Sequence, residues 1–188
     1  PPRSTLFPYT TLFRSVSLVS SMIAHKGEAE TKEWLEGVKA NLARKPQGND
    51  RGQVQAIHQN LCDLTIGNSY YFGKMLQDEQ QKEWADSVFI NFPNQQDRGA
   101  HVNVSGVVLT KHAKNKENAL KLIEFMTDNT AQNMYASVNM EYPVKPGVPL
   151  SELVASWGEF SEDSLPLSEI SKHRPAALRL LDEVKFDL

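Results

Sequence analysis

Apolar residues recur at intervals of three and four along most of the chain, with charged and polar residues between them. This spacing is typical of amphipathic helices that pack one face on a core. The clearest case is the stretch from Lys116 to Met126, where Ala119, Leu122 and Ile123 fall on one face. A glycine, Gly27, separates the first two helical patterns. We expect helices over residues 16–24, 28–42, 51–59, 70–76, 116–126, 129–138 and 175–184.

Three shorter segments have the alternation or the apolar run of a β-strand. They are residues 62–67, 88–92 and 102–110. Residues 142–149 contain three prolines and are expected to be extended. Strands that alternate with helices indicate an α/β fold, although the strands are few for a chain of 188 residues.

Composition and charge exclude several classes of function. The formal net charge is −3, so no basic surface indicates a nucleic-acid partner. The apolar runs are shorter than the roughly 20 residues of a membrane-spanning helix, so no direct membrane insertion is expected. The single cysteine, Cys62, is expected to be a small buried hydrophobe. No nucleophile–base pair or phosphate-binding glycine loop is present, which favours a protein that is not an enzyme. The histidines form no cluster with metal-ligand spacing; they are His25, His58, His101, His112 and His173.

The first fifteen residues read PPRSTLFPYTTLFRS, which is what the translation of a common short-read sequencing adapter gives. We therefore expect residues 1–15 not to be native and leave them out of the fold prediction. On this view the native sequence starts at about Val16, in mid-gene, and any upstream signal peptide or lobe has been lost. Tyr9 and Arg14 accordingly receive no functional role.

The candidate site is the stretch Asn68-Ser69-Tyr70-Tyr71, which follows a predicted strand and opens a predicted helix. A helix start presents unpaired N–H groups and a positive dipole end, which favour negative charge. Ionised phenol oxygens are strong ligands for hard cations, and a trivalent ion helps a phenol lose its proton. A tyrosine pair is nevertheless more often aromatic packing, so both interpretations remain open at this point.

Several stretches resemble the carboxy-terminal part of the periplasmic ferric-iron-binding proteins, in the same order as in that family. The match spans nearly the whole chain from Val16 to Phe186. It is carried by Ser17-Leu18-Val19 with Met22-Ile23, RKPQGND (44–50), CDLTIGNSYY (62–71), Phe92 to Gln95, residues 101–124, Glu141 to Val144 and residues 155–160.

The resemblance implies a two-lobe, type II periplasmic-binding-protein fold that is incomplete here, with most of the amino-terminal lobe missing. Residues 16–100 and 152–188 are then expected in the carboxy-terminal lobe, and residues 101–151 in the remainder of the amino-terminal lobe. Because the missing half would cover part of residues 101–151, we expect them to expose apolar side chains.

The resemblance also implies the function. Tyr70 and Tyr71 are expected to be Fe(3+) ligands, and Asn68 to lie near the iron or a companion anion such as carbonate or phosphate. The protein is expected to be a periplasmic monomer that delivers iron to the inner-membrane permease of an ABC transporter, by a hinge closure of its lobes. The alternatives are a receptor of the same fold for an anion or small organic solute, and an enzyme on a two-lobe scaffold, such as a transferase.

Overall fold

The computed structural model of the chain describes residues 6–7, 12–45 and 47–186, with side chains from Val16 onward. The chain divides into two compact units. Unit 1 comprises residues 1–102 and 160–188, and unit 2 comprises residues 103–159. The unit boundaries differ from the predicted lobe boundaries for residues 101–102, which fall in unit 1, and for residues 152–159, which fall in unit 2. That the two units correspond to the two lobes stays a prediction.

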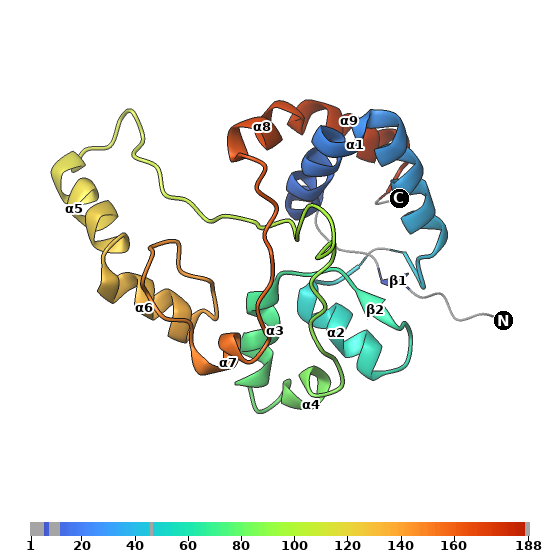
Figure 1. Ribbon diagram of the computed structural model, residues 1–188, viewed down its shortest axis with the longest axis horizontal. Helices are drawn as coiled ribbons and strands as arrows, with labels where there is room; N and C mark the ends of the chain where they lie inside the picture. The colour runs from blue at the N-terminus through green and yellow to red at the C-terminus, as the bar shows by residue number, and fades with distance from the viewer. Residues whose placement is uncertain (1–5, 8–11, 46, 187–188) are drawn as a thin grey trace. The chain divides into compact units, whose positions relative to one another are not determined.

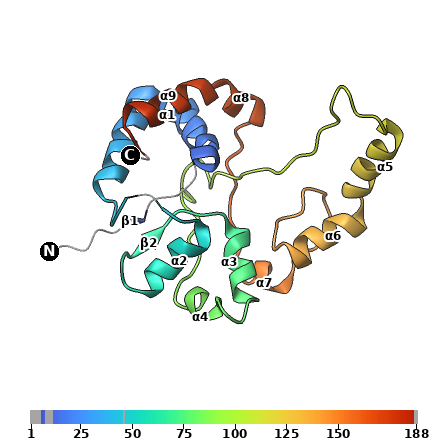
Figure 2. The ribbon, with the colours of Figure 1, turned by 180° about the vertical axis from the view of Figure 1, so that it is seen from behind.

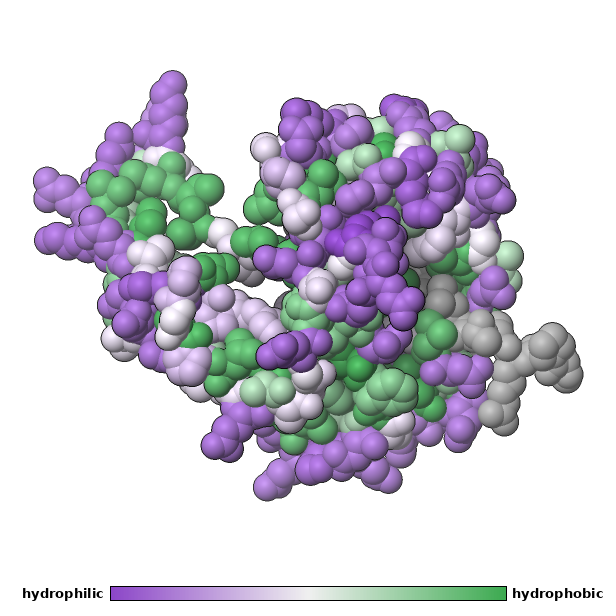
Figure 3. Space-filling model, viewed as in Figure 1, coloured by the Kyte–Doolittle hydropathy of each residue, from purple (hydrophilic) through white to green (hydrophobic). Residues whose placement is uncertain are grey.

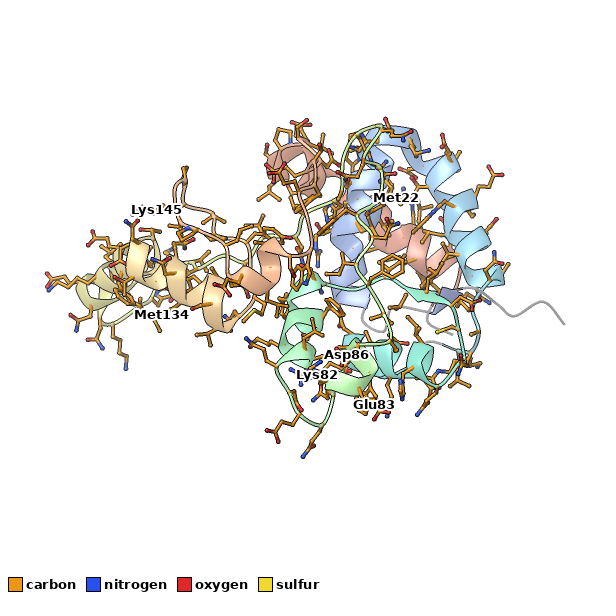
Figure 4. All side chains as sticks on the ribbon, turned by 60° about the horizontal axis from the view of Figure 1, so that its bottom comes forward. Met22, Lys82, Glu83, Asp86, Met134 and Lys145 are labelled. Atoms are coloured by element: carbon orange, nitrogen blue, oxygen red, sulfur yellow. The ribbon has the colours of Figure 1, made fainter. Side chains whose placement is uncertain are left out.

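The first core of unit 1 lies between helices α1 (Leu12–Ala40) and α9 (Arg174–Glu183), and helix α8 (Leu167–Lys172) also contacts α1. Helices α1 and α9 lie side by side in Figures 1 and 2, although they come from opposite ends of the chain. Gly27 has φ 81° and ψ 171° and breaks α1 into two helical segments, as the sequence predicts. Met22, labelled on α1 in Figure 4, is buried. The buried residues that join α1 to the carboxy-terminal segment are Val16, Val19, Ile23, Leu35, Ala177, Leu180, Leu181, Val184 and Phe186.

The amino-terminal segment contributes more structure than the sequence analysis expected. Helix α1 begins at Leu12, four residues before the predicted native start. Strand β1 (Leu6–Phe7) pairs in parallel with strand β2 (Leu64–Thr65), with Leu6 opposite Leu64 and Phe7 opposite Thr65. Residues 1–15 were left out of the fold prediction, so neither element was predicted; any chain with free N–H and C=O groups can pair with an open strand edge. That these residues are not native stays a prediction. Tyr9 lies outside the described residues.

The second core of unit 1 joins helices α2 (Asp50–His58), α3 (Ser69–Leu76) and α4 (Lys82–Ala85). The first two agree with the predicted helices to within one residue at each end. Val54, Met75 and Ala85 are buried at the centre of this core. Partly buried side chains surround them: Phe72, Leu76, Trp84 and Val88. Helix α4, like α7 and α8, was not predicted, because four to six residues are too few to show a helical period.

The predicted strands are mostly wrong. Of residues 62–67 only Leu64–Thr65 are in a strand, and Leu64 is 43% exposed instead of buried. Within the described part of the chain, residues 88–92 and 102–110 belong to no strand. Alternation shows only that a segment suits a pleated, half-buried surface; a strand also needs a hydrogen-bonded partner.

A single β-bridge, and not a longer strand pairing, joins the two segments by which the chain leaves and re-enters unit 1. Ala100 and Glu162 form an isolated parallel bridge. The Ala100 N–H donates to the Ser161 carbonyl at 2.8 Å, and the Asp163 N–H donates to the Ala100 carbonyl at 2.8 Å. The Phe92 and Phe160 rings stack beside it, with centroids 4.2 Å apart. These contacts fix residues 99–101 against residues 160–163 within unit 1.

The buried carboxylate of Asp163 attaches this bridge to α1. One oxygen accepts from the Ser21 hydroxyl at 3.0 Å and lies 2.8 Å from His25 Nε2. The other accepts from the Leu165 N–H at 3.0 Å. Burial alone would raise the pKa of Asp163, but the hydrogen bonds from Leu165, His25 and Ser21 and the charge of His25 lower it below its ordinary value.

Unit 2 contains helices α5 (Lys116–Met126), α6 (Asn129–Val138) and α7 (Glu152–Ala155). The first two match the predicted helices, and Asp128 caps α6 by accepting from the Ala131 N–H at 2.9 Å. The apolar exposure expected for residues 101–151 is confirmed, and Figure 3 shows apolar residues at the surface of this unit. The exposed side chains are Val104, Val107, Val108, Leu120, Leu122, Phe125, Met134, Val138, Val144 and Leu150.

We predict that Gly99→Ala destabilises unit 1. Gly99 has φ +88°, and a Cβ at this position would meet the Glu162 carbonyl carbon at 2.6 Å. Backbone cannot move aside cheaply, so the free energy of unfolding should fall by about 2 kcal/mol or more. Urea denaturation measures it. Gly37→Ala is the matched control, because its Cβ meets nothing within 4 Å on helix α1 and should be neutral or stabilising. Equal midpoints for Gly99→Ala and the parent would contradict the packing at this bridge.

We also predict an acid-dependent loss of stability from Asp163. Its pKa in the folded chain lies below the ordinary 3.8, so its contribution is complete above about pH 4 and is lost as the pH falls through the folded value. Asp163→Asn should lower stability near neutral pH and weaken this acid dependence, as followed by urea midpoints between about pH 3 and 7. The exposed Asp97→Asn should retain the parental profile. An unchanged acid profile in Asp163→Asn would show that the carboxylate does not hold the bridge.

Candidate metal centre

The tyrosine pair lies in the first turn of α3, where the sequence predicts it. Gly67 leads into Asn68, which has an extended backbone (φ −83°, ψ 133°) and occupies the N-cap position. The helix begins at Ser69, and the Tyr71 N–H donates to the Asn68 carbonyl at 3.2 Å. Tyr70 and Tyr71 are therefore the second and third residues of the helix, beside its positive dipole end.

The two phenol rings lie next to each other. Their centroids are 4.2 Å apart and their planes are inclined by 34°. Consecutive helix positions differ by about 100° around the axis, so this contact requires both side chains to extend on the same side of the helix start. Both residues are half-buried. The aromatic packing considered as an alternative is thus present, but it occupies the ring faces and leaves open what the hydroxyl oxygens bind.

A buried carboxylate, Asp50, fixes the turn that leads into the pair. Asp50 is 6% exposed, and its Oδ1 accepts from the Asn68 backbone N–H at 3.1 Å and from the Asn68 Nδ2 at 3.4 Å. A Cβ at Gly67 would lie 3.4 Å from the same oxygen, so the carboxylate packs closely on this turn. The backbone and the side-chain amide of Asn68 both donate to Asp50, so this carboxylate orients the residue that precedes the pair.

Asp50 was not among the candidate site residues of the sequence analysis. The cap of α2 is Asn49, whose Oδ1 accepts from the Gly52 N–H at 3.0 Å. The contact between Asp50 and Asn68 spans 18 positions. Periodicity and local motifs indicate only contacts between residues close in the sequence, so the sequence alone does not predict this contact.

A cation also approaches the pair. The Arg51 guanidinium carbon lies 5.9 Å from the centroid of the Tyr71 ring. This distance is within the range of a cation–π interaction, in which a cation is attracted to the electron-rich ring face.

The remaining titratable residues form no second metal centre in the part of the chain that the structure describes. There, no group of three or more His, Cys, Asp or Glu residues is placed to hold a metal ion. His25 is paired with Asp163, and His58 lies 3.9 Å from Glu83. Burial lowers the pKa of His101, which Arg98 lowers further and Asp163 partly offsets. Among the described helices, none is both long and apolar enough to cross a bilayer.

Comparison with known proteins decides the family. Residues 26–162 match the family described as bacterial extracellular solute-binding protein. The chain belongs to this family. It is 45% identical to Synechocystis sp. iron uptake protein A1 over 169 residues. The aligned region covers 89% of this chain and 47% of that relative. It is 29% identical over 130 residues to the major ferric iron-binding protein of Neisseria meningitidis serogroup B, covering 69% of this chain and 38% of that protein.

Solved structures give the same result for the fold. The apo ferric ion-binding protein A of Pasteurella haemolytica superposes with a TM-score of 0.96 at 51% identity, covering 100% of this chain and 60% of that chain. A Trichodesmium protein solved in complex with iron and citrate gives a TM-score of 0.90 at 34% identity, covering 98% of this chain and 59% of that chain.

These comparisons confirm the resemblance to ferric-iron-binding periplasmic proteins and the incomplete two-lobe, type II fold predicted from the sequence. The chain spans about half the length of the Synechocystis relative and 60% of the Pasteurella structure. The α/β class therefore describes the fold to which the chain belongs, although its own described residues contain a sheet of only two short strands.

We predict that Cys62 is inert in the folded chain and takes no part in metal binding. Burial and the charge of Asp63 raise the pKa of its thiol to about 11, so about one thiol in a thousand is ionised at pH 8. An aromatic disulfide reagent should react slowly at pH 8 and rapidly after unfolding in guanidinium. The reaction is followed by absorbance, and equal rates in both states would show that the thiol is accessible.

Proposed function

We propose that this chain is part of a periplasmic receptor that binds Fe(3+) through the phenolate oxygens of Tyr70 and Tyr71. The observation that supports it best is the pair of rings held 4.2 Å apart in the first turn of α3. The relatives are named as an iron uptake protein and a ferric iron-binding protein, which agrees with this ligand.

The chemistry of the site suits a trivalent cation. Free tyrosine has a pKa of about 10, so a phenol is neutral at pH 7 unless a strong local charge favours its ionised form. Fe(3+) supplies that charge, and the positive end of the α3 dipole adds to it. Hard cations prefer oxygen donors, and two phenolates from adjacent positions supply two anionic oxygens at little entropic cost.

A companion anion is part of the proposal. The α3 start offers backbone N–H groups, and Asn68 lies beside them as the N-cap residue. Carbonate or phosphate is small enough to bridge these donors and the metal. The Trichodesmium protein was solved with iron and citrate, which shows that a carboxylate can accompany iron in that relative.

We also propose that the receptor delivers its iron to an ABC-type inner-membrane permease; membership of the extracellular solute-binding family supports this. The receptor is proposed to act as a periplasmic monomer. A receptor for an anion or small organic solute is the second candidate, since the family description names only a solute. The ligand set separates the two, because a solute site needs a charged anchor and apolar walls, whereas an iron site needs converging oxygens.

The test is a titration of the chain with Fe(3+) supplied as its nitrilotriacetate complex. Coordination by phenolate produces a visible phenolate-to-iron charge-transfer band, which neither component shows alone. Tyr70→Phe and Tyr71→Phe should each weaken binding by more than the roughly 10- to 100-fold typical of an outer-shell partner, and the double variant should lose the band. Because the chain covers half to 60% of its relatives, we expect its affinity to be well below theirs.

Tyr135→Phe is the matched control, because Tyr135 is a half-buried tyrosine on α6 in unit 2. It should keep the band and the affinity of the parent. A parent without the band, or a Tyr70→Phe/Tyr71→Phe variant that keeps it, would contradict the proposed ligands.

A further inference from the structure

The contact between Arg51 and Tyr71 continues the packing of α2 against α3. In the core, Val54 of α2 packs with Met75 of α3. Arg51 precedes Val54 by three residues and Tyr71 precedes Met75 by four, so each lies on the same face of its helix, one turn nearer the amino terminus. The interhelical interface thus begins with an apolar contact and ends with a cation over the ring of a proposed iron ligand.

The start of α2 is fixed independently of Arg51. Asn49 caps the helix, and the buried Asp50 carboxylate is bonded to the backbone of Asn68. Asp50 immediately precedes Arg51, and Asn68 lies three residues before Tyr71. The backbones that carry the guanidinium and the phenol are therefore joined close to the two side chains, which keeps the ring within reach of Arg51.

The positive charge of Arg51 would affect a metal ion bound by Tyr71. The guanidinium lies 5.9 Å from the ring centroid, and an ion held by the phenol oxygen lies beyond the edge of the ring. Charge transfer from phenolate to iron moves an electron away from the guanidinium, which costs energy.

We propose that Arg51 is a positioning residue of the iron site: it holds the Tyr71 ring against α2 and places a positive charge beside this proposed ligand. This inference rests on the proposed function, because it needs Tyr71 to be a ligand. Arg51 itself acts through Tyr71 and is not proposed to touch the metal.

The experiment compares Arg51→Gln and Arg51→Lys with the parent, each loaded with Fe(3+) from its nitrilotriacetate complex. In Arg51→Gln the charge-transfer band should move to longer wavelength by on the order of 5 nm, the size expected for removing one unit charge at this distance at an effective dielectric constant of about 20. Arg51→Lys keeps the charge and should return the band toward the parental position. Glutamine and lysine have similar helix propensity, so both variants should fold, which far-ultraviolet circular dichroism checks.

Lys82→Gln is the charge-matched control. Lys82 is the first residue of α4, and its ion-pair partner at 2.6 Å is Asp86, which follows the helix; both are about half exposed (Figure 4). It should leave the band where it is in the parent. A band in Arg51→Gln at the parental wavelength would overturn the role of Arg51 while leaving the proposed function intact. A parent without any band would instead overturn the proposed function.

Discussion

The site depends on one buried interaction, the hydrogen bond from the Asn68 backbone to the Asp50 carboxylate. A charge in a 6% exposed side chain is tolerated only when it is well bonded, and here the backbone and side chain of Asn68 both donate to it. This bond ties the first turn of α2 to the turn that begins α3. The direction in which Tyr70 and Tyr71 leave the chain follows from it, as does the approach of Arg51 to Tyr71.

The two units differ in how completely they bury their apolar residues. Unit 1 has its main core between α1 and α9 and a second core around Val54 and Met75. In unit 2, helix α5 has no buried residue, and large apolar side chains such as Val108 and Leu122 are exposed. A surface of this kind is normally covered. The coverage of about 60% of the solved relatives agrees with a fold whose remaining elements are outside this sequence.

Tyrosine packing and metal binding are compatible at this site. The rings of Tyr70 and Tyr71 contact each other, and Arg51 lies over Tyr71, which restricts the side chains before any ligand arrives. A ligand pair that is already ordered pays less conformational entropy on binding. The contacts between the rings, which agree with the aromatic packing considered from the sequence, therefore also favour the proposed function.

The sequence by itself determined the longer helices, the break at Gly27, the position of the tyrosine pair at a helix start and the family. Helix periods, a glycine at positive φ and contiguous motifs are local properties, which depend only on residues that are neighbours in the sequence. Tertiary structure alone decided the rest. The predicted strands at residues 88–92 and 102–110 did not form, because a strand exists only with a partner. Asp50 and Arg51 reached the tyrosines, and Asp163 reached α1, through contacts between distant segments, and such contacts are set by how helices pack.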